Sequence, residues 1–317
     1  MLKHDVATLA TAQGRMVGTE GHDFARDHIV ARLEIIGVQP YSSNSFMLPY
    51  EYNGEAFVNI VGQIPGRNRD LPQVLLGAHY DTCGPYPGAD DNAAAVAVLL
   101  AAAERLKEIQ LDRTLVLAFF DAEEPPYYLS PSMGSIRFYE DQKMQDIHCA
   151  IIMDLVGHDV PFPGLEDLVF ITGMESDPGL EQVVKEAEPF SGIRTIPTLN
   201  AYVGDMSDHH IFRTNSRPYL FLTCGRWEHY HSPSDTPDRL NYEKMTVIAD
   251  YLAELAERVS LKRLEGPFEG FDTTDTEIYF LTKNIKPSLE RFGLAMDIES
   301  REDINQLVDL MMTQFDL

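Results

Sequence analysis

The chain has 317 residues with 44% hydrophobic composition, enough for one large domain with a complete core. Fifty acidic residues against 25 basic ones give a formal charge of −25, which disfavours binding to nucleic acid and to anionic membranes. The first residues do not predict an export signal, and no run of about eighteen apolar residues predicts a membrane span. Cys83, Cys149 and Cys224 form no Cys-x-x-Cys pair and indicate free thiols, so we expect a cytoplasmic protein.

The predicted elements alternate between helices and short apolar strands. Apolar residues at helical spacing predict the helices, and charge-free apolar runs predict buried strands. This alternation indicates a layered α/β sheet. In chain order we expect helices at residues 5–13, 21–36, 93–106, 178–188 and 240–261, and strands at 57–62, 73–78, 114–120, 149–153, 168–171, 193–196 and 219–222.

Two local patterns near the start of the chain predict contacts. Phe24 shares one face of the second helix with Ile29 and Leu33, so we expect its side chain to be buried. The Pro-Gly pair at residues 65–66 ends the first strand, and the polar residues 67–70 predict the tip of a hairpin leading into the next strand.

The Gly-Pro pair at residues 266–267 predicts a boundary between a main domain, residues 1–265, and a C-terminal extension, residues 266–317. The extension carries an apolar helical stripe that would form a sizeable exposed patch unless the body or a second chain covers it. A homodimer through the extension is therefore one expected assembly. The stripe consists of Ile304, Leu307, Val308, Met311 and Phe315.

Acidic and histidine side chains follow several predicted strands directly. His79 and Asp81 come at the end of the strand at 73–78, and Asp154 follows the strand at 149–153. Ligands of open α/β sheets collect at the carboxyl ends of the strands. An Asp-Asp pair at a helix start is by itself well explained by the helix dipole. The whole set is harder to explain as solvated charge.

The side chains collected at this edge are nitrogen and oxygen donors of the kind that binds zinc or a similar first-row metal. They are numerous enough for two ions, each keeping an open position if one carboxylate bridges. Such a pair of ions implies hydrolysis. The expected metal ligands are His79, Asp91, Glu124, Asp154 and His231.

Five motifs in order make the chain similar to the co-catalytic zinc exopeptidases, a family that includes bacterial leucyl aminopeptidases and glutamate carboxypeptidases. The resemblance implies a mixed, mostly parallel sheet flanked by helices on both faces, with two zinc ions. The motifs are Gly77 to Thr82, Gly88 to Asn92, Ala122 to Glu124, Met153 to Gly157 and Tyr230 to Thr236, and weaker similarity extends from about residue 10 to about residue 260.

Carried over position by position, the resemblance implies that Asp91 bridges the two ions and that its peptide bond to Asn92 is cis. One ion is then bound by His79 and Asp154 and the other by Glu124 and His231. Glu123 becomes the general base. Asp81 is expected to orient the His79 ring, and Tyr230 to donate its hydroxyl to the developing oxyanion.

Residues 125–133 depart from the family pattern, because they replace a short glycine-containing loop after the Glu-Glu pair. The leading prediction is an aminopeptidase acting on short peptides or aminoacyl substrates. Arg226 keeps a carboxypeptidase open as an alternative, since a carboxylate reader needs a basic group. A glutaminyl-cyclase-like acyltransferase, which binds one zinc without the first histidine ligand, is disfavoured by His79. A binding module without catalysis is disfavoured by the complete ligand set.

Overall fold

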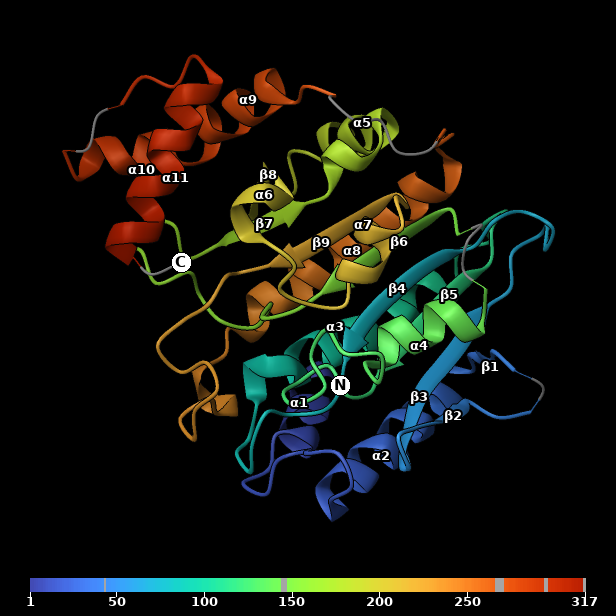
Figure 1. Ribbon diagram of the computed structural model, residues 1–317. Coiled ribbons are helices and arrows are strands. Elements are labelled where there is room, and N and C mark those ends of the chain that lie inside the picture. The colour runs from blue at the N-terminus through green and yellow to red at the C-terminus, as the bar shows by residue number, and fades with distance from the viewer. Residues whose placement is uncertain (43, 144–146, 266–270, 294–295, 316–317) are drawn as a thin grey trace.

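A mixed nine-stranded sheet crosses the molecule in the computed structural model, which describes residues 1–42, 44–143, 147–265, 271–293 and 296–315, without the side chains of 312–315 (Figure 1). The strand order is β1-β3-β5-β4-β6-β9-β7-β8, and β2 pairs with β3. The strands are β1 (Gln39–Pro40), β2 (Met47–Tyr52), β3 (Glu55–Ile64), β4 (Val74–His79), β5 (Leu115–Phe120), β6 (Cys149–Met153), β7 (Leu168–Thr172), β8 (Arg194–Thr198) and β9 (Tyr219–Thr223).

The four central strands, β5, β4, β6 and β9, are parallel to one another. Antiparallel pairs flank them, because β3 runs against β5 and β7 runs against β9. The sheet is therefore mixed with a parallel centre, as the sequence predicts. Because the carboxyl ends of parallel neighbours meet at one edge, residues that follow β4, β5 and β6 are brought together.

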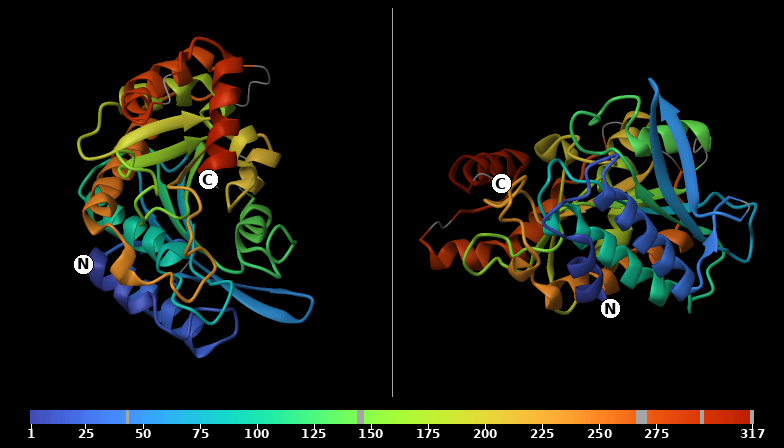
Figure 2. Two further views of the ribbon diagram at one scale, coloured as in Figure 1. Left: turned by 90° about the vertical axis from the view of Figure 1, so that its left-hand side faces the viewer. Right: turned by 90° about the horizontal axis from the view of Figure 1, so that it is seen from below.

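Helices cover both faces of the sheet (Figure 2). On one face lie α1 (Leu2–Leu9), α2 (Glu20–Ile36), α3 (Ala95–Leu106) and α8 (Tyr242–Leu261). On the other face lie α4 (Gly134–Asp141) and α7 (His210–Thr214), while α5 (Pro178–Glu186) packs against α8 and α6 (Asn200–Val203) follows β8. No helix among the described residues is long and apolar enough to cross a membrane.

The central strands are apolar throughout because both of their faces are buried. In β4, Val74 and Leu76 join the core cluster that contains α3 and α8, whereas Leu75 joins the cluster that contains α4 and α7. All three side chains are fully buried. This two-sided burial explains why these strands read as continuous apolar runs rather than as alternating patterns.

Two predictions about the first third of the chain are wrong. Phe24 is 53% exposed, because the buried face of α2 is formed by His22, Ala25 and Ile29, one position further round the helix. Residues 67–70 are not a hairpin tip either. Strand β5 lies between β3 and β4, and the backbone N–H of Arg67 donates to the carbonyl of Leu111, just before β5.

Strand β2 is not among the predicted strands. It pairs with β3 as an antiparallel hairpin around Asn53 and Gly54, and both of these residues have a positive φ. An Asn-Gly pair is a strong hairpin signal. Pro49, inside β2, obscures it, because proline is tolerated only where a strand has a free edge.

The C-terminal segment forms α9 (Thr274–Asn284), α10 (Lys286–Arg291) and α11 (Arg301–Phe315), drawn in orange to red at the β8 end of the sheet (Figure 1). The Asn284 amide donates to the Thr195 carbonyl at 2.9 Å, which attaches α9 to β8. Ile304 and Leu307 are buried in the main core, so the body of the same chain covers this part of the apolar stripe. The predicted boundary at residues 266–267 lies outside the described residues, and so does the side chain at the end of the stripe, that of Phe315.

Candidate metal centre

The carboxyl edge of the parallel strands gathers the five predicted ligands. His79 is the last residue of β4, Asp154 follows β6, and Glu124 follows β5 after three residues. Asp91 lies in the turn that leads into α3, and His231 lies in the long loop after β9. The Asp91–Asn92 peptide bond is cis, as predicted.

One group of donor atoms surrounds the His79 ring. Its Nε2 atom lies 3.3 Å from Asp91 Oδ1 and 3.5 Å from Asp154 Oδ2. All three residues are buried, and one donor atom from each lies within 4.8 Å of the others. This spacing leaves the three atoms facing a common point.

A second group surrounds His231. Its Nε2 atom lies 3.1 Å from Asp91 Oδ2 and 3.0 Å from Glu124 Oε2. Asp91 therefore presents one carboxylate oxygen to each histidine. A carboxylate in this position is suited to bridge two cations.

Metal ions fit these donors, because several donor atoms lack another partner. His79 Nε2, His231 Nε2 and Asp154 Oδ1 are buried and have no hydrogen-bond partner among the described residues. Buried polar atoms are normally paired, so unpaired ones at a shared point require explanation. Imidazole nitrogen and carboxylate oxygen are ligands that zinc accepts.

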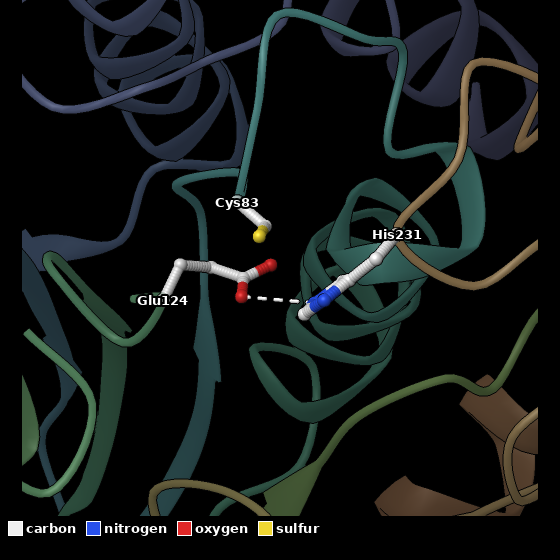
Figure 3. A group of neighbouring side chains, drawn as sticks. All are labelled: Cys83, Glu124 and His231. Carbon is white, nitrogen blue, oxygen red and sulfur yellow. Dashed lines mark ion pairs between the residues drawn. The ribbon is translucent and has the colours of Figure 1, made fainter. Parts of the chain in front are cut away.

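Cys83 adds a donor that the predicted ligand set omitted. It lies in the loop after β4, and its side chain points toward Glu124 and His231 (Figure 3). Its Sγ lies within 4.8 Å of the donor atoms of those two residues. The chain's three cysteines are all free, as the sequence predicted.

Asp81 supports both groups from behind. Its Oδ1 lies 3.3 Å from His79 Nδ1, on the ring edge opposite the one that faces Asp91. The same carboxylate accepts hydrogen bonds from the backbone N–H groups of Glu123 and Glu124, at 3.1 and 3.0 Å. One buried side chain thus fixes positions after two neighbouring strands.

The turn that carries Asp91 is held by residues distant in sequence. Asp235 accepts hydrogen bonds from the backbone N–H groups of Asp90, at 2.9 Å, and Asp91, at 3.1 Å. Asp90 in turn receives a 2.6 Å contact from His158 Nδ1. The buried Arg15 guanidinium donates to the Gly88 carbonyl at 2.8 Å.

Three residues at or next to the ligands have left-handed backbones without being glycine. They are Ala122 (φ 55), Leu155 (φ 54) and His231 (φ 50). Ala122 precedes Glu123, and Leu155 follows Asp154. Such residues cost about 1 to 3 kcal/mol each and cluster at functional sites. The edge thus combines unpaired donors with local strain.

The carboxylates and histidines shift one another's protonation. Burial opposes protonation of His231, but the adjacent Asp91 and Glu124 carboxylates outweigh it and raise the pKa of His231 to about 10. Burial opposes protonation of His79 too, yet the nearby Glu123 and Asp154 carboxylates raise the pKa of His79 well above its ordinary value. Both imidazoles are therefore poised to carry protons that a bound cation would displace.

The two glutamates after β5 occupy different surroundings. Glu124 reaches His231, whereas Glu123 Oε2 lies 3.8 Å from His79 Nε2. Burial raises the pKa of Glu123 well above its ordinary value, and burial with the neighbouring Asp91 charge raises the pKa of Glu124 to about 8. The direction of the Glu123 shift could not be read from the sequence, because burial and positive charge act oppositely.

A cavity of about 200 Å³ opens beside these residues, with Asp154 and Tyr230 in its wall. The Tyr230 ring stacks on the His231 ring with centroids 3.8 Å apart. Burial raises the pKa of Tyr230, so its hydroxyl keeps its proton at neutral pH. Arg226 also lines the cavity and lies over the Tyr230 ring at 5.0 Å.

Sequence reasoning gave no role to Arg15, Asp235 or Cys83. Arg15 and Asp235 lie inside stretches that the family resemblance covers. The resemblance could therefore have drawn attention to both residues, but it did not indicate that they contact the Asp91 turn. Their partners around the Asp91 turn are more than sixty residues away, and no local pattern specifies such pairs. Cys83 lies next to the first motif, where a thiol adds no recognisable spacing.

Residues 59–256, more than half of the chain, match the family described as Peptidase family M28. Among curated proteins, the uncharacterized YfbL of Escherichia coli is 31% identical over 212 residues, covering 57% of this chain and 65% of that protein. A vacuolar membrane protease of Vanderwaltozyma polyspora is 28% identical over 155 residues, covering 49% of this chain and 15% of that protein. The chain therefore matches less than two thirds of each relative's length.

Solved structures share the fold at low sequence identity. The LapA aminopeptidase of Legionella pneumophila has a TM-score of 0.67 at 18% identity, covering 82% of this chain and 71% of its own. A Zn-dependent exopeptidase of Parabacteroides distasonis has a TM-score of 0.64 at 18% identity, covering 81% of this chain and 96% of its own. A glutaminyl cyclase of Bacteroides thetaiotaomicron scores 0.62 at 18% identity, covering 81% and 96%.

The fold, with its cluster of histidines and carboxylates at the carboxyl edge of the sheet, is shared with solved structures described as an aminopeptidase and a Zn-dependent exopeptidase. The chain belongs to peptidase family M28. The family match confirms the resemblance that the five motifs predicted.

Proposed function

We propose that the chain is an exopeptidase that uses two zinc ions bridged by Asp91. The observation that carries the proposal is the position of the Asp91 carboxylate, whose two oxygens face His79 and His231 separately. Asp154 completes one group and Glu124 the other. Three protein ligands for each ion leave open positions, which is the pattern of catalytic rather than structural zinc.

When bound, the zinc ions supply Lewis acidity, which polarises the scissile carbonyl and makes water acidic enough to attack near neutral pH. Glu123 is the proposed general base, because it is buried beside His79 and is not needed as a ligand. Its carboxylate takes a proton from the attacking water and passes it to the leaving amine.

Tyr230 is the proposed donor to the developing oxyanion. Its ring is fixed by stacking on His231, and its hydroxyl stays protonated because burial raises its pKa. A hydrogen bond that strengthens as charge develops lowers the barrier to hydrolysis. Asp81 contributes by holding the His79 ring and the backbone of both glutamates.

An aminopeptidase is the form of this function that we favour. The ligand edge is rich in carboxylates and the whole chain is acidic, which suits an ammonium group on the substrate. Arg226, in the wall of the cavity, supports a carboxypeptidase as the second candidate. The Arg226→Ala variant distinguishes the two through the ratio of activities on the two substrate types, because only a reader of carboxylates should lose its selectivity for a free carboxyl terminus.

The experiment begins with metal removal by 1,10-phenanthroline, reloading with zinc and elemental analysis. We expect two zinc ions per chain, and one ion in the His231→Ala variant. The exposed His4→Ala variant should keep both. The reloaded protein is then assayed on peptides blocked at either terminus and on an amino-terminal glutaminyl peptide. A single bound zinc ion together with cyclisation of the glutaminyl peptide would contradict this proposal and indicate a glutaminyl cyclase instead.

A further inference from the structure

The cavity beside Asp154 and Tyr230 is lined mainly by apolar side chains. Phe170 and Phe221 contribute from β7 and β9, and Met206 from the loop before α7. An apolar cavity of roughly 150 Å³ is large enough to bind benzene, so about 200 Å³ has room for an aromatic or branched side chain. The cavity therefore suits a large apolar group.

Part of this cavity's wall comes from the C-terminal helix. Val308 and Met311 of α11 line the cavity, and both are half-buried. The preceding residues of the same stripe, Ile304 and Leu307, are buried in the core. Residues three and four apart share a helix face, so anchoring by the first pair directs the second pair toward the cavity.

Polar contacts hold α11 against the cavity wall. Tyr202, itself a lining residue, donates its hydroxyl to Asn305 of α11. Arg301 donates to Tyr202 Oη at 3.3 Å and forms a two-bond pair with the buried Glu277 of α9. Two-bond arginine pairs fix orientation as well as position. Polar contacts as well as apolar packing therefore hold the helix in the wall of the cavity.

We propose that α11 forms the outer wall of the pocket for the substrate's terminal side chain, and that Val308 and Met311 select large apolar side chains. The inference rests on the proposed exopeptidase function and adds a specificity role for the C-terminal extension. Helix α11 lies outside residues 59–256, the part of the chain that matches the family, so the family match does not assign this role.

The first test uses the zinc-loaded 317-residue chain and measures by calorimetry the binding of two probes that have no scissile bond, phenethylamine and 3-phenylpropanoate. At least one probe should bind the parent. Val308→Trp fills the pocket and should lower the affinity for that probe by about tenfold or more, the range expected when an apolar pocket is altered. Gln306→Trp places the same bulk on the exposed side of α11 and should bind like the parent.

Met311→Ala tests the same wall with a milder change, in case the larger residue prevents folding. It enlarges the pocket and should raise affinity for 1-naphthylethylamine or 3-(1-naphthyl)propanoate severalfold relative to the phenyl probe. Failure of both phenyl probes to bind the parent, or equal affinities in parent, Val308→Trp and Met311→Ala, would overturn the inference.

Hydrolysis separates this inference from the proposed function. With leucyl, phenylalanyl and alanyl anilides as substrates, Val308→Trp should lower kcat/KM for the leucyl and phenylalanyl anilides and leave kcat/KM for the alanyl anilide unchanged. A merely structural role for α11 would lower all three together. If α11 controls probe binding but the parent cleaves no terminal peptide bond, the pocket stands and the exopeptidase proposal fails.

Discussion

The backbone N–H of Glu124 donates a hydrogen bond to Asp81 Oδ2 at 3.0 Å. The other oxygen of Asp81 lies 3.3 Å from His79 Nδ1. Glu124 belongs to the donor group around His231, and His79 belongs to the other group. Asp81 therefore couples the positions of both groups through one buried carboxylate.

Asp81→Asn should weaken zinc binding by roughly 10-fold to 100-fold, because residues that orient ligands typically contribute that much to metal affinity. An amide cannot accept two backbone hydrogen bonds and face the imidazole with negative charge at the same time. Competition with a zinc-sensitive dye measures the change. The exposed Asp70→Asn variant is the control and should bind zinc as the parent does. Unchanged affinity in Asp81→Asn would show that Asp81 does not position the ligands.

Glu123→Gln should keep the fold and both metal ions but lower turnover by roughly 10²-fold to 10⁴-fold, the usual contribution of a placed proton-transfer group. Elemental analysis and steady-state kinetics on the same preparation measure both quantities. The exposed Glu228→Gln variant controls for loss of one carboxylate near the site. Near-normal turnover by Glu123→Gln with both ions bound would remove Glu123 as the general base.

Glu124→Gln should behave differently, because Glu124 Oε2 lies 3.0 Å from His231 Nε2 in the second donor group. We expect it to lose affinity for one zinc ion, measured as the zinc content after dialysis against a weak chelator. Excess zinc should restore part of its activity. If dialysis leaves two tightly bound ions, Glu124 is not a ligand.

Arg15→Met should destabilise the turn that carries Asp91. The buried guanidinium donates to the carbonyls of Tyr80, Pro87 and Gly88, at 2.8, 2.6 and 2.8 Å. Burial lowers the pKa of Arg15 only to about 10, so it remains charged at neutral pH. Leaving these carbonyls without donors should cost roughly 3 to 5 kcal/mol of unfolding free energy.

Urea denaturation of the metal-free protein measures that cost without the contribution of bound zinc. The exposed Arg69→Met variant removes the same charge and should change stability by less than about 0.5 kcal/mol. A similar small change in Arg15→Met would show that water or backbone rearrangement replaces the guanidinium.

His209 should make the protein less stable as the pH falls from about 6.5 to about 4. Burial lowers the pKa of His209 to about 4, so the unfolded chain takes up this proton first and acidification favours unfolding. The full effect is about 3 kcal/mol. His209→Gln should lose less stability over this pH range, measured by urea denaturation, whereas the exposed His4→Gln should follow the parent. If the unfolding free energy depended on pH identically in all three proteins, His209 would not be the group that lowers stability in acid.

The sequence by itself determined the donor chemistry of the edge and most of the elements that carry it. His79 and Asp154 directly follow apolar runs. Such runs form strands buried on both faces, because all of their side chains are apolar. The side-chain types and their order along the chain suffice for this prediction. The helices at 93–106 and 240–261 were foreseen for the same reason, since their apolar spacing is local.

Only the tertiary structure decided which distant residues support and surround that edge. Nothing in the pattern of residues 57–78 indicates that β5 lies between β3 and β4, because several strands are equally apolar and could pair. Arg15 and Asp235 reach the Asp91 turn across long sequence separations. Val308 meets the cavity because α9 and α11 pack back onto the β8 end of the sheet. Such contacts depend on the path of the whole chain, which periodicity over a few residues does not encode.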